Sequence, residues 1–79
     1  MFRRELVTRK VFKKTEILIW ESGTKDRGYI EVVLNDPLND KSIVVLYREY
    51  RGWKSYSKAM IAAYNSKLSL IDALKGKHS

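Results

Sequence analysis

Hydrophobic residues recur with a strand-like period over the first two thirds of this 79-residue chain and with a helical period over the last third. β-Branched and aromatic residues predict a strand over residues 15–21, which the turn-prone run 22–28 follows. Residues 29–34 and 42–50 predict two further strands, separated by a turn rich in Asn, Asp and Pro at residues 35–40. An antiparallel sheet is therefore expected within residues 15–51.

The segment before this sheet, residues 1–14, is basic and only weakly apolar. Its pairs Val7-Thr8 and Val11-Phe12 favour extended structure. The segment is expected to be either a basic arm or the first strand of the sheet.

The strand predicted over residues 42–50 has no polar face in its first half. Strict alternation places Ile43, Val45 and Tyr47 on one face, and it places Val44, Leu46, Arg48 and Tyr50 on the other. We therefore expect a central strand, covered by a helix on one side and by residues 1–14 or a second subunit on the other. A homodimer is one way to bury the surplus apolar surface.

After Gly52 the apolar period becomes helical, and a helical region is expected over residues 54–75. Two stripes at helical spacing are candidates to pack on the sheet. One consists of Tyr56, Met60, Ala63 and Lys67, and the other of Ile61, Tyr64, Leu68 and Ile71, with Tyr64 expected in the core. The region could form one long helix or two helices broken near residues 65–69. The break is suggested by Asn65-Ser66, which disfavour a helix interior, and by a second capping pattern at residues 69–72. The fold class is α+β, a three- to four-stranded antiparallel meander packed against a C-terminal helix in one domain, residues 1–79.

Composition narrows the functional classes. There is no cysteine, which excludes disulfides and fits a reducing cytoplasmic compartment. No apolar run approaches the roughly 18 residues of a membrane span. The formal net charge is +7, with eight basic and four acidic residues in 1–27, one and three in 28–47, and seven and two in 48–79. Basic flanks around an acidic middle favour a polyanionic partner.

Residues suited to catalysis are sparse. His78 is the only histidine and lies near the chain end. The carboxylates show no metal-ligand spacing, and residues 36–40 lack the Gly and Glu of a calcium loop. No glycine-rich phosphate loop is present. We expect no enzymatic activity, no metal and no cofactor.

The richest binding segment is residues 47–58, which interleaves four aromatic rings with four cationic side chains. Arg48, Arg51, Lys54 and Lys58 are expected to converge where strand becomes helix, while Trp53 and Tyr56 close the core. Lys25 and Arg27 are expected at a hairpin tip, where phosphate contact is sterically easy.

The strand 28–34 (GYIEVVL) and the helix segment 59–65 (AMIAAYN) resemble the AP2-type and integrase N-terminal DNA-binding domains. In those families a three-stranded sheet enters the major groove and arginine side chains read guanine. The resemblance implies contact residues at Lys25, Arg27, Tyr29, Arg48 and Tyr50. Glu31 departs from the pattern, since a cationic or aromatic residue is expected on that strand face.

These observations together predict a small basic, non-catalytic nucleic-acid-binding protein of viral, phage or mobile-element type, with DNA favoured over RNA. The predicted contact residues are Lys25, Arg27, Tyr29, Arg48, Tyr50, Arg51, Lys54 and Lys58. One alternative is an adaptor or inhibitor that docks on an acidic protein, since Trp, Tyr and Arg dominate protein interfaces. Another is a structural homo-oligomer whose edge strands pair through Val44 and Leu46. No membrane partner is expected.

Overall fold

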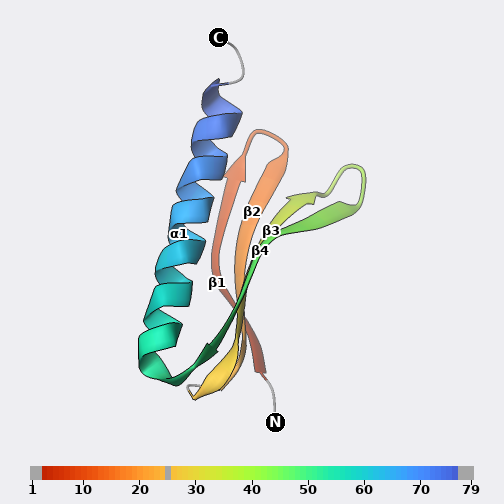
Figure 1. Ribbon diagram of the computed structural model, residues 1–79. Coiled ribbons are helices and arrows are strands. Elements are labelled where there is room, and N and C mark those ends of the chain that lie inside the picture. Colours follow the sequence, from red (N-terminus) through yellow and green to blue (C-terminus); the bar gives the residue numbers. More distant parts are fainter. Residues whose placement is uncertain (1–2, 25, 77–79) are drawn as a thin grey trace.

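The computed structural model describes residues 3–24 and 26–76, which form a four-stranded antiparallel sheet and one long helix. The strands follow one another in chain order across the sheet: β1 (Arg3–Phe12), β2 (Thr15–Gly23), β3 (Arg27–Asp36) and β4 (Lys41–Arg51). The helix α1 (Gly52–Gly76) runs along one face of this sheet and leaves the other face open (Figure 1). The predicted α+β class and meander are confirmed, and the N-terminal segment provides a first strand.

The strands are longer and the turns shorter than the apolar pattern predicts. Polar side chains on the open face extend the pairing beyond the apolar segments. Asn35 donates a hydrogen bond to Glu16 Oε1 at 2.7 Å and accepts one from Ser42 at 2.7 Å, so β2, β3 and β4 are joined near their ends. Arg9 of β1 adds a hydrogen bond and an ion pair to Glu16, which completes a polar row across all four strands.

The core lies between the sheet and α1. Its four largest fully buried side chains come from the two central strands and are Ile17, Ile19, Ile30 and Val32. Ala59 and Ala63, one turn apart on α1, are buried against them. Small side chains at these two positions allow the helix to approach the sheet closely, so the sheet supplies most of the core volume.

The helix is continuous, and it packs the stripe of Tyr56, Met60 and Ala63 on the sheet. Tyr56, Met60, Leu70, Ile71 and Leu74 pack around the two buried alanines, as expected for Tyr56 and Ile71. In the second stripe Ile61 is 61% exposed and Leu68 is 58% exposed. Tyr64, which was expected in the core, is exposed as well. Trp53, expected in the core, is 71% exposed. The face with Ala59 and Ala63 packs on the sheet because only small side chains allow the helix to approach the sheet closely.

β4 is an edge strand, which corrects the expectation of a central one, because residues 3–12 pair with β2 at the opposite side of the sheet. A β-bulge at Val45 also breaks the predicted alternation. Val44 is the partner of Val33 and Leu46 the partner of Val32, so Val44 and Leu46 lie on opposite faces. The β3–β4 hairpin leans away from α1 (Figure 1), which leaves the apolar residues before the bulge exposed.

Candidate functional site

The end of the sheet is held together where β4 becomes α1. Gly52 joins the two elements directly, with the positive φ of 84° that glycine adopts without strain. Its N–H donates to Asp26 O at 2.7 Å, and the Tyr50 hydroxyl donates to Thr24 O at 2.6 Å. These two bonds fix the β2–β3 turn against the start of the helix.

Tyr50 is part of this clamp and not of an exposed surface. It is only 4% exposed, lies opposite Gly28 in the ladder, and contacts Tyr56 edge to face with ring centroids 4.9 Å apart. A Cβ on Gly28 would lie 2.1 Å from Ser22 O and 2.7 Å from the Tyr50 hydroxyl. Tyr50, nominated from the sequence as a contact residue, is therefore buried, because the glycine leaves the space that its ring occupies.

Arg27 and Arg51 are direct partners in the β3–β4 ladder, and both are exposed. Strand alternation places them on the open face of the sheet. In the described part of the chain, the ion pairs join Arg3 to Glu5, Arg4 to Glu31 and Arg9 to Glu16, so neither member of this arginine pair takes part in one. Like charges directly opposite each other destabilise a sheet. The first turn of α1 adds no acidic residue to balance them.

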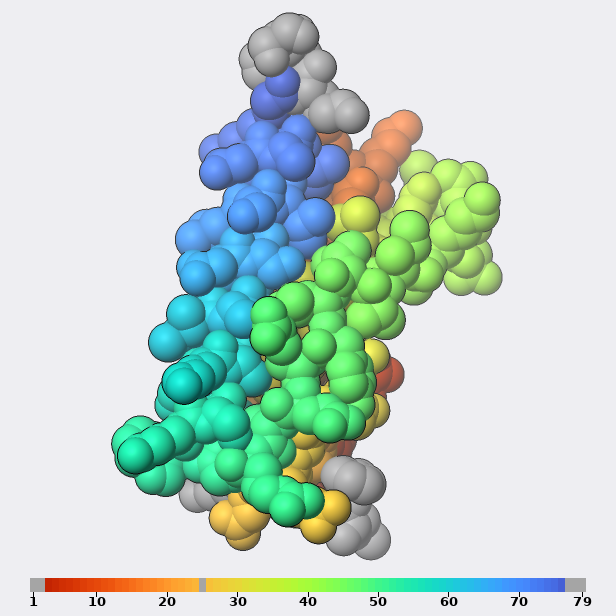
Figure 2. Space-filling model, in the orientation of Figure 1, coloured from red at the N-terminus to blue at the C-terminus, as the bar shows by residue number. Residues whose placement is uncertain are grey.

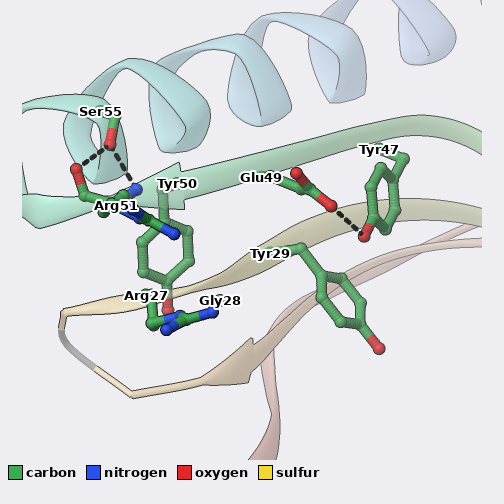
Figure 3. A pocket seen from close by; sticks show the side chains of 8 residues that line it. All are labelled: Arg27, Gly28, Tyr29, Tyr47, Glu49, Tyr50, Arg51 and Ser55. Atoms are coloured by element: carbon green, nitrogen blue, oxygen red, sulfur yellow. Dashed lines mark hydrogen bonds between the residues drawn. The ribbon is translucent and has the colours of Figure 1, made fainter.

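An open hollow of about 620 Å³ lies beside the arginine pair. Its lining residues are Arg27, Gly28, Tyr29, Tyr47, Glu49, Tyr50, Arg51 and Ser55. Figure 3 shows the two arginines at the end where β4 passes into α1, and Tyr29, Tyr47 and Glu49 further along the strands. Cationic and aromatic groups therefore share one concave surface.

Tyr29 and Tyr47 form the aromatic part of the hollow. Their ring centroids are 5.0 Å apart with planes inclined by 32°, and Tyr47 is 49% exposed. The Tyr47 hydroxyl donates to Glu49 Oε2 at 3.2 Å. Partial burial, followed by the charge of Glu49, raises the pKa of the Tyr47 hydroxyl, so it stays a neutral donor. Glu49 is the one acid among the lining residues.

The predicted contact residues divide into three groups. Arg27, Tyr29, Tyr50 and Arg51 line the hollow together, with Tyr50 buried. Arg48 is opposite Ile30 on the helix side of β4, so it does not join them, and Lys54 and Lys58 are exposed on α1 outside the lining.

Lys25 and His78 lie outside the described residues. Tyr47 and Ser55 line the hollow but were not nominated from the sequence. The available signal for Tyr47 was its place on the same strand face as Arg51, four residues away.

No group of three or more His, Cys, Asp or Glu side chains is positioned to hold a metal ion within residues 3–24 and 26–76. Over that same part of the chain, no helix is both long and apolar enough to cross a membrane.

Comparisons of the chain with models of protein families, with curated proteins and with solved structures found no match. The resemblance to AP2-type and integrase N-terminal domains consequently stays a prediction.

Proposed function

We propose that this protein binds nucleic acid through the hollow at the strand-to-helix junction, as a small non-catalytic protein of viral or mobile-element type. The observation that carries the proposal is the pair Arg27 and Arg51. Two guanidinium groups held opposite each other without an acidic partner cost stability, and a phosphate group between them relieves that repulsion. DNA is the target favoured over RNA, because the sequence resemblance is to DNA-binding domains.

The tyrosines support the same proposal. Arginine binds phosphate, and a neighbouring aromatic ring stacks on a base or packs against a sugar, so the combination fits a nucleotide chain better than a lone anion. Tyr47 offers its exposed ring surface on the same strand face as Arg51, four residues away along β4. Glu49 opposes an anion, although its hydrogen bond from Tyr47 occupies one carboxylate oxygen.

Positive charge around the hollow supports association as well. Lys54 and Lys58 are exposed on the first two turns of α1, and Arg48 is exposed on the helix side of β4. They lie outside the hollow, so we assign them the role of attracting the phosphate backbone without fixed geometry.

The double substitution of Arg27 and Arg51 by alanine tests the proposal. We expect affinity for a mixed-sequence DNA duplex, and for its separated strands, to fall at least tenfold. The slope of log K against log salt concentration should also become shallower by roughly 1.5–2, since about one counterion is released per neutralised phosphate. Fluorescence anisotropy of labelled DNA at several sodium chloride concentrations measures both quantities.

The matched control is Lys41→Ala with Lys75→Ala, which removes the same net charge at positions distant from the junction. It should change affinity by less than about threefold if the hollow is the site, because screened charges act weakly at long range. Equal losses in the two double variants would reduce the binding to net charge and refute the assignment to the hollow. Circular dichroism establishes that both variants are folded.

A further inference from the structure

The outward surface of α1 carries a line of large apolar side chains that the sheet does not cover. We call it the outer stripe, and it consists of Trp53, Ile61, Tyr64 and Leu68. At 100° per residue these positions fall within about 80° of one another around the helix. Three of them are more than half exposed, and Figure 2 shows the teal start of the helix projecting from the outline of the molecule.

The spacing of the outer stripe is that of a helix-pairing seam. Ile61, Tyr64 and Leu68 stand at intervals of three and four residues, the a–d–a pattern of a heptad, and Ile71 continues it toward the sheet. The stripe from Trp53 to Leu68 is about 22 Å long at 1.5 Å per residue. A helix that lies on a membrane surface presents a broader apolar face than this stripe. The other apolar face of α1 packs on the sheet and cannot add to it.

Tyr64 is held in position on this surface. The ammonium group of Lys67 lies 5.5 Å from the Tyr64 ring centroid and also donates to Thr8 Oγ1 of β1 at 3.1 Å. Lys67 therefore links Tyr64 of the stripe to β1 of the sheet. A partner therefore meets a partly ordered surface, which lowers the entropic cost of binding.

Charge determines the kind of partner. α1 carries Lys54, Lys58, Lys67 and Lys75 but only one acid, Asp72. An antiparallel second copy that sets Ile61 against Leu68 also sets Lys54 against Lys75 at both ends, and a parallel copy sets each lysine against itself. Both arrangements bring like charges together, while acidic residues flanking an apolar seam complement all four lysines.

We infer that the outer stripe is a second binding surface, separate from the basic hollow, which takes an amphipathic helix of another protein with an apolar seam and acidic flanks. It lies on a different side of α1 from Ser55, the helix residue that lines the hollow, since Ser55 is bonded to Arg51 of β4. The surface lets the protein bring a nucleic acid and an acidic protein together.

Three synthetic helical peptides test the inference against the full-length protein. The first has Leu at the a and d positions with Glu at the flanking e and g positions, the second has Lys in place of Glu, and the third has Ser in place of Leu. We expect the Leu/Glu peptide to bind at least tenfold more tightly than either of the others, as measured by calorimetry. The Ser/Glu peptide reports attraction by charge alone.

The variant Ile61→Ser with Leu68→Ser should weaken binding of the Leu/Glu peptide at least tenfold and leave the fold intact, because both side chains are exposed. Leu38→Ser is the matched control, since it removes an exposed leucine from the β3–β4 turn and should change nothing. The substitution of Arg27 and Arg51 by alanine should also leave peptide binding within about threefold, because these residues lie outside the stripe.

Three outcomes would overturn the inference. Equal binding of the Ser/Glu and Leu/Glu peptides would mean that charge alone attracts them. A sedimentation mass that rises with concentration, and falls back to monomer in the double serine variant, would make a second copy the occupant. Cosedimentation with phosphatidylserine vesicles that the same variant abolishes would make the stripe a membrane-contacting surface.

Discussion

At the scale of single residues, residues of the same type within residues 47–58 differ sharply in burial. Tyr50 and Trp53 are both aromatic and three residues apart, yet Tyr50 is buried and Trp53 is among the most exposed side chains. The difference arises from Gly28, which leaves room for one ring, and from Gly52, which turns the chain outward. Both effects depend on glycines elsewhere in the chain, so the burial of Tyr50 and the exposure of Trp53 could not be predicted from residue type.

Tyr56 provides a prediction at this scale. Its hydroxyl donates to Glu21 Oε1 at 2.8 Å, and burial together with this hydrogen bond raises the pKa of Tyr56 from 10.0 to about 12. Because the folded-state pKa lies above the unfolded value, the contribution to stability is complete below pH 10 and is lost as pH rises toward 12. We expect the free energy of unfolding to fall over this interval.

Tyr56→Phe is the comparison for that measurement. It should lower stability by about 1 kcal/mol at neutral pH, through loss of the hydrogen bond to the carboxylate. It should also show a shallower decline between pH 10 and 12, as followed by urea unfolding. Identical pH profiles for the two proteins would contradict the assigned pKa.

At the scale of elements, the strands within residues 15–51 and their order follow from apolar periodicity, and the start of the helix follows from Gly52. The same pattern left open whether residues 1–14 form a strand and whether the helix is broken near residues 65–69. The face of α1 that packs was not predictable in the same way. Two apolar stripes compete on this helix, and the larger residues, Ile61 and Leu68, favour the wrong one on hydrophobicity alone. Ala59 and Ala63 decide the packing because they allow close approach, which is a property of the assembled layers. The bulge at Val45 could not be predicted from strict alternation either, because it depends on how β4 pairs with β3.

The β2–β3 hairpin carries the prediction at this scale. Gly28→Ala places a Cβ 2.1 Å from Ser22 O, a backbone atom that cannot move without separating the strands. We expect a loss of about 2 kcal/mol in the free energy of unfolding. We also expect weaker DNA binding, because Arg27 is the next residue.

Gly76→Ala is the matched control, since a Cβ there meets no atom of residues 3–24 and 26–76 within 4 Å. It should leave stability and DNA binding nearly unchanged. Denaturant unfolding and anisotropy measure the two effects, and a Gly28→Ala variant as stable as the wild type would show that the hairpin tolerates the side chain.

At the scale of the whole molecule, hydrogen bonds and ion pairs to acidic side chains are distributed unevenly over the open face of the sheet. Acidic side chains on the open face are engaged by Arg4, Arg9 and Asn35, whereas none of the ion pairs in the described part of the chain includes Arg27 or Arg51 at the strand-to-helix junction. The sequence predicted a basic cluster near this junction, but it assigned Arg48 in place of Arg27 as the close neighbour of Arg51. Cross-strand register decides that choice, and register depends on turns whose lengths the sequence pattern overestimated.

Arg51→Gln should therefore raise stability while it weakens nucleic-acid binding. Removal of one of two directly opposed like charges is expected to contribute about 0.5 kcal/mol at low salt. The gain should shrink as sodium chloride is added, because salt screens exposed charges. Thermal unfolding at low and high salt measures it.

Lys75→Gln removes the same charge from the C-terminal turn of α1, where a cation is favourable. It should not raise stability. A similar gain in both variants would attribute the effect to net charge and not to the arginine pair.

The order of the strands also bears on how quickly the protein reaches this structure. Every strand pairs with its neighbour in the chain, the described connections are short, and α1 begins at the residue after β4. Formation of each element therefore closes only a small loop, and the entropy lost at each step stays low. Assembly can proceed hairpin by hairpin, with the helix closing over a sheet that is already paired. Folding on the fast side for a sheet-containing protein follows from this arrangement.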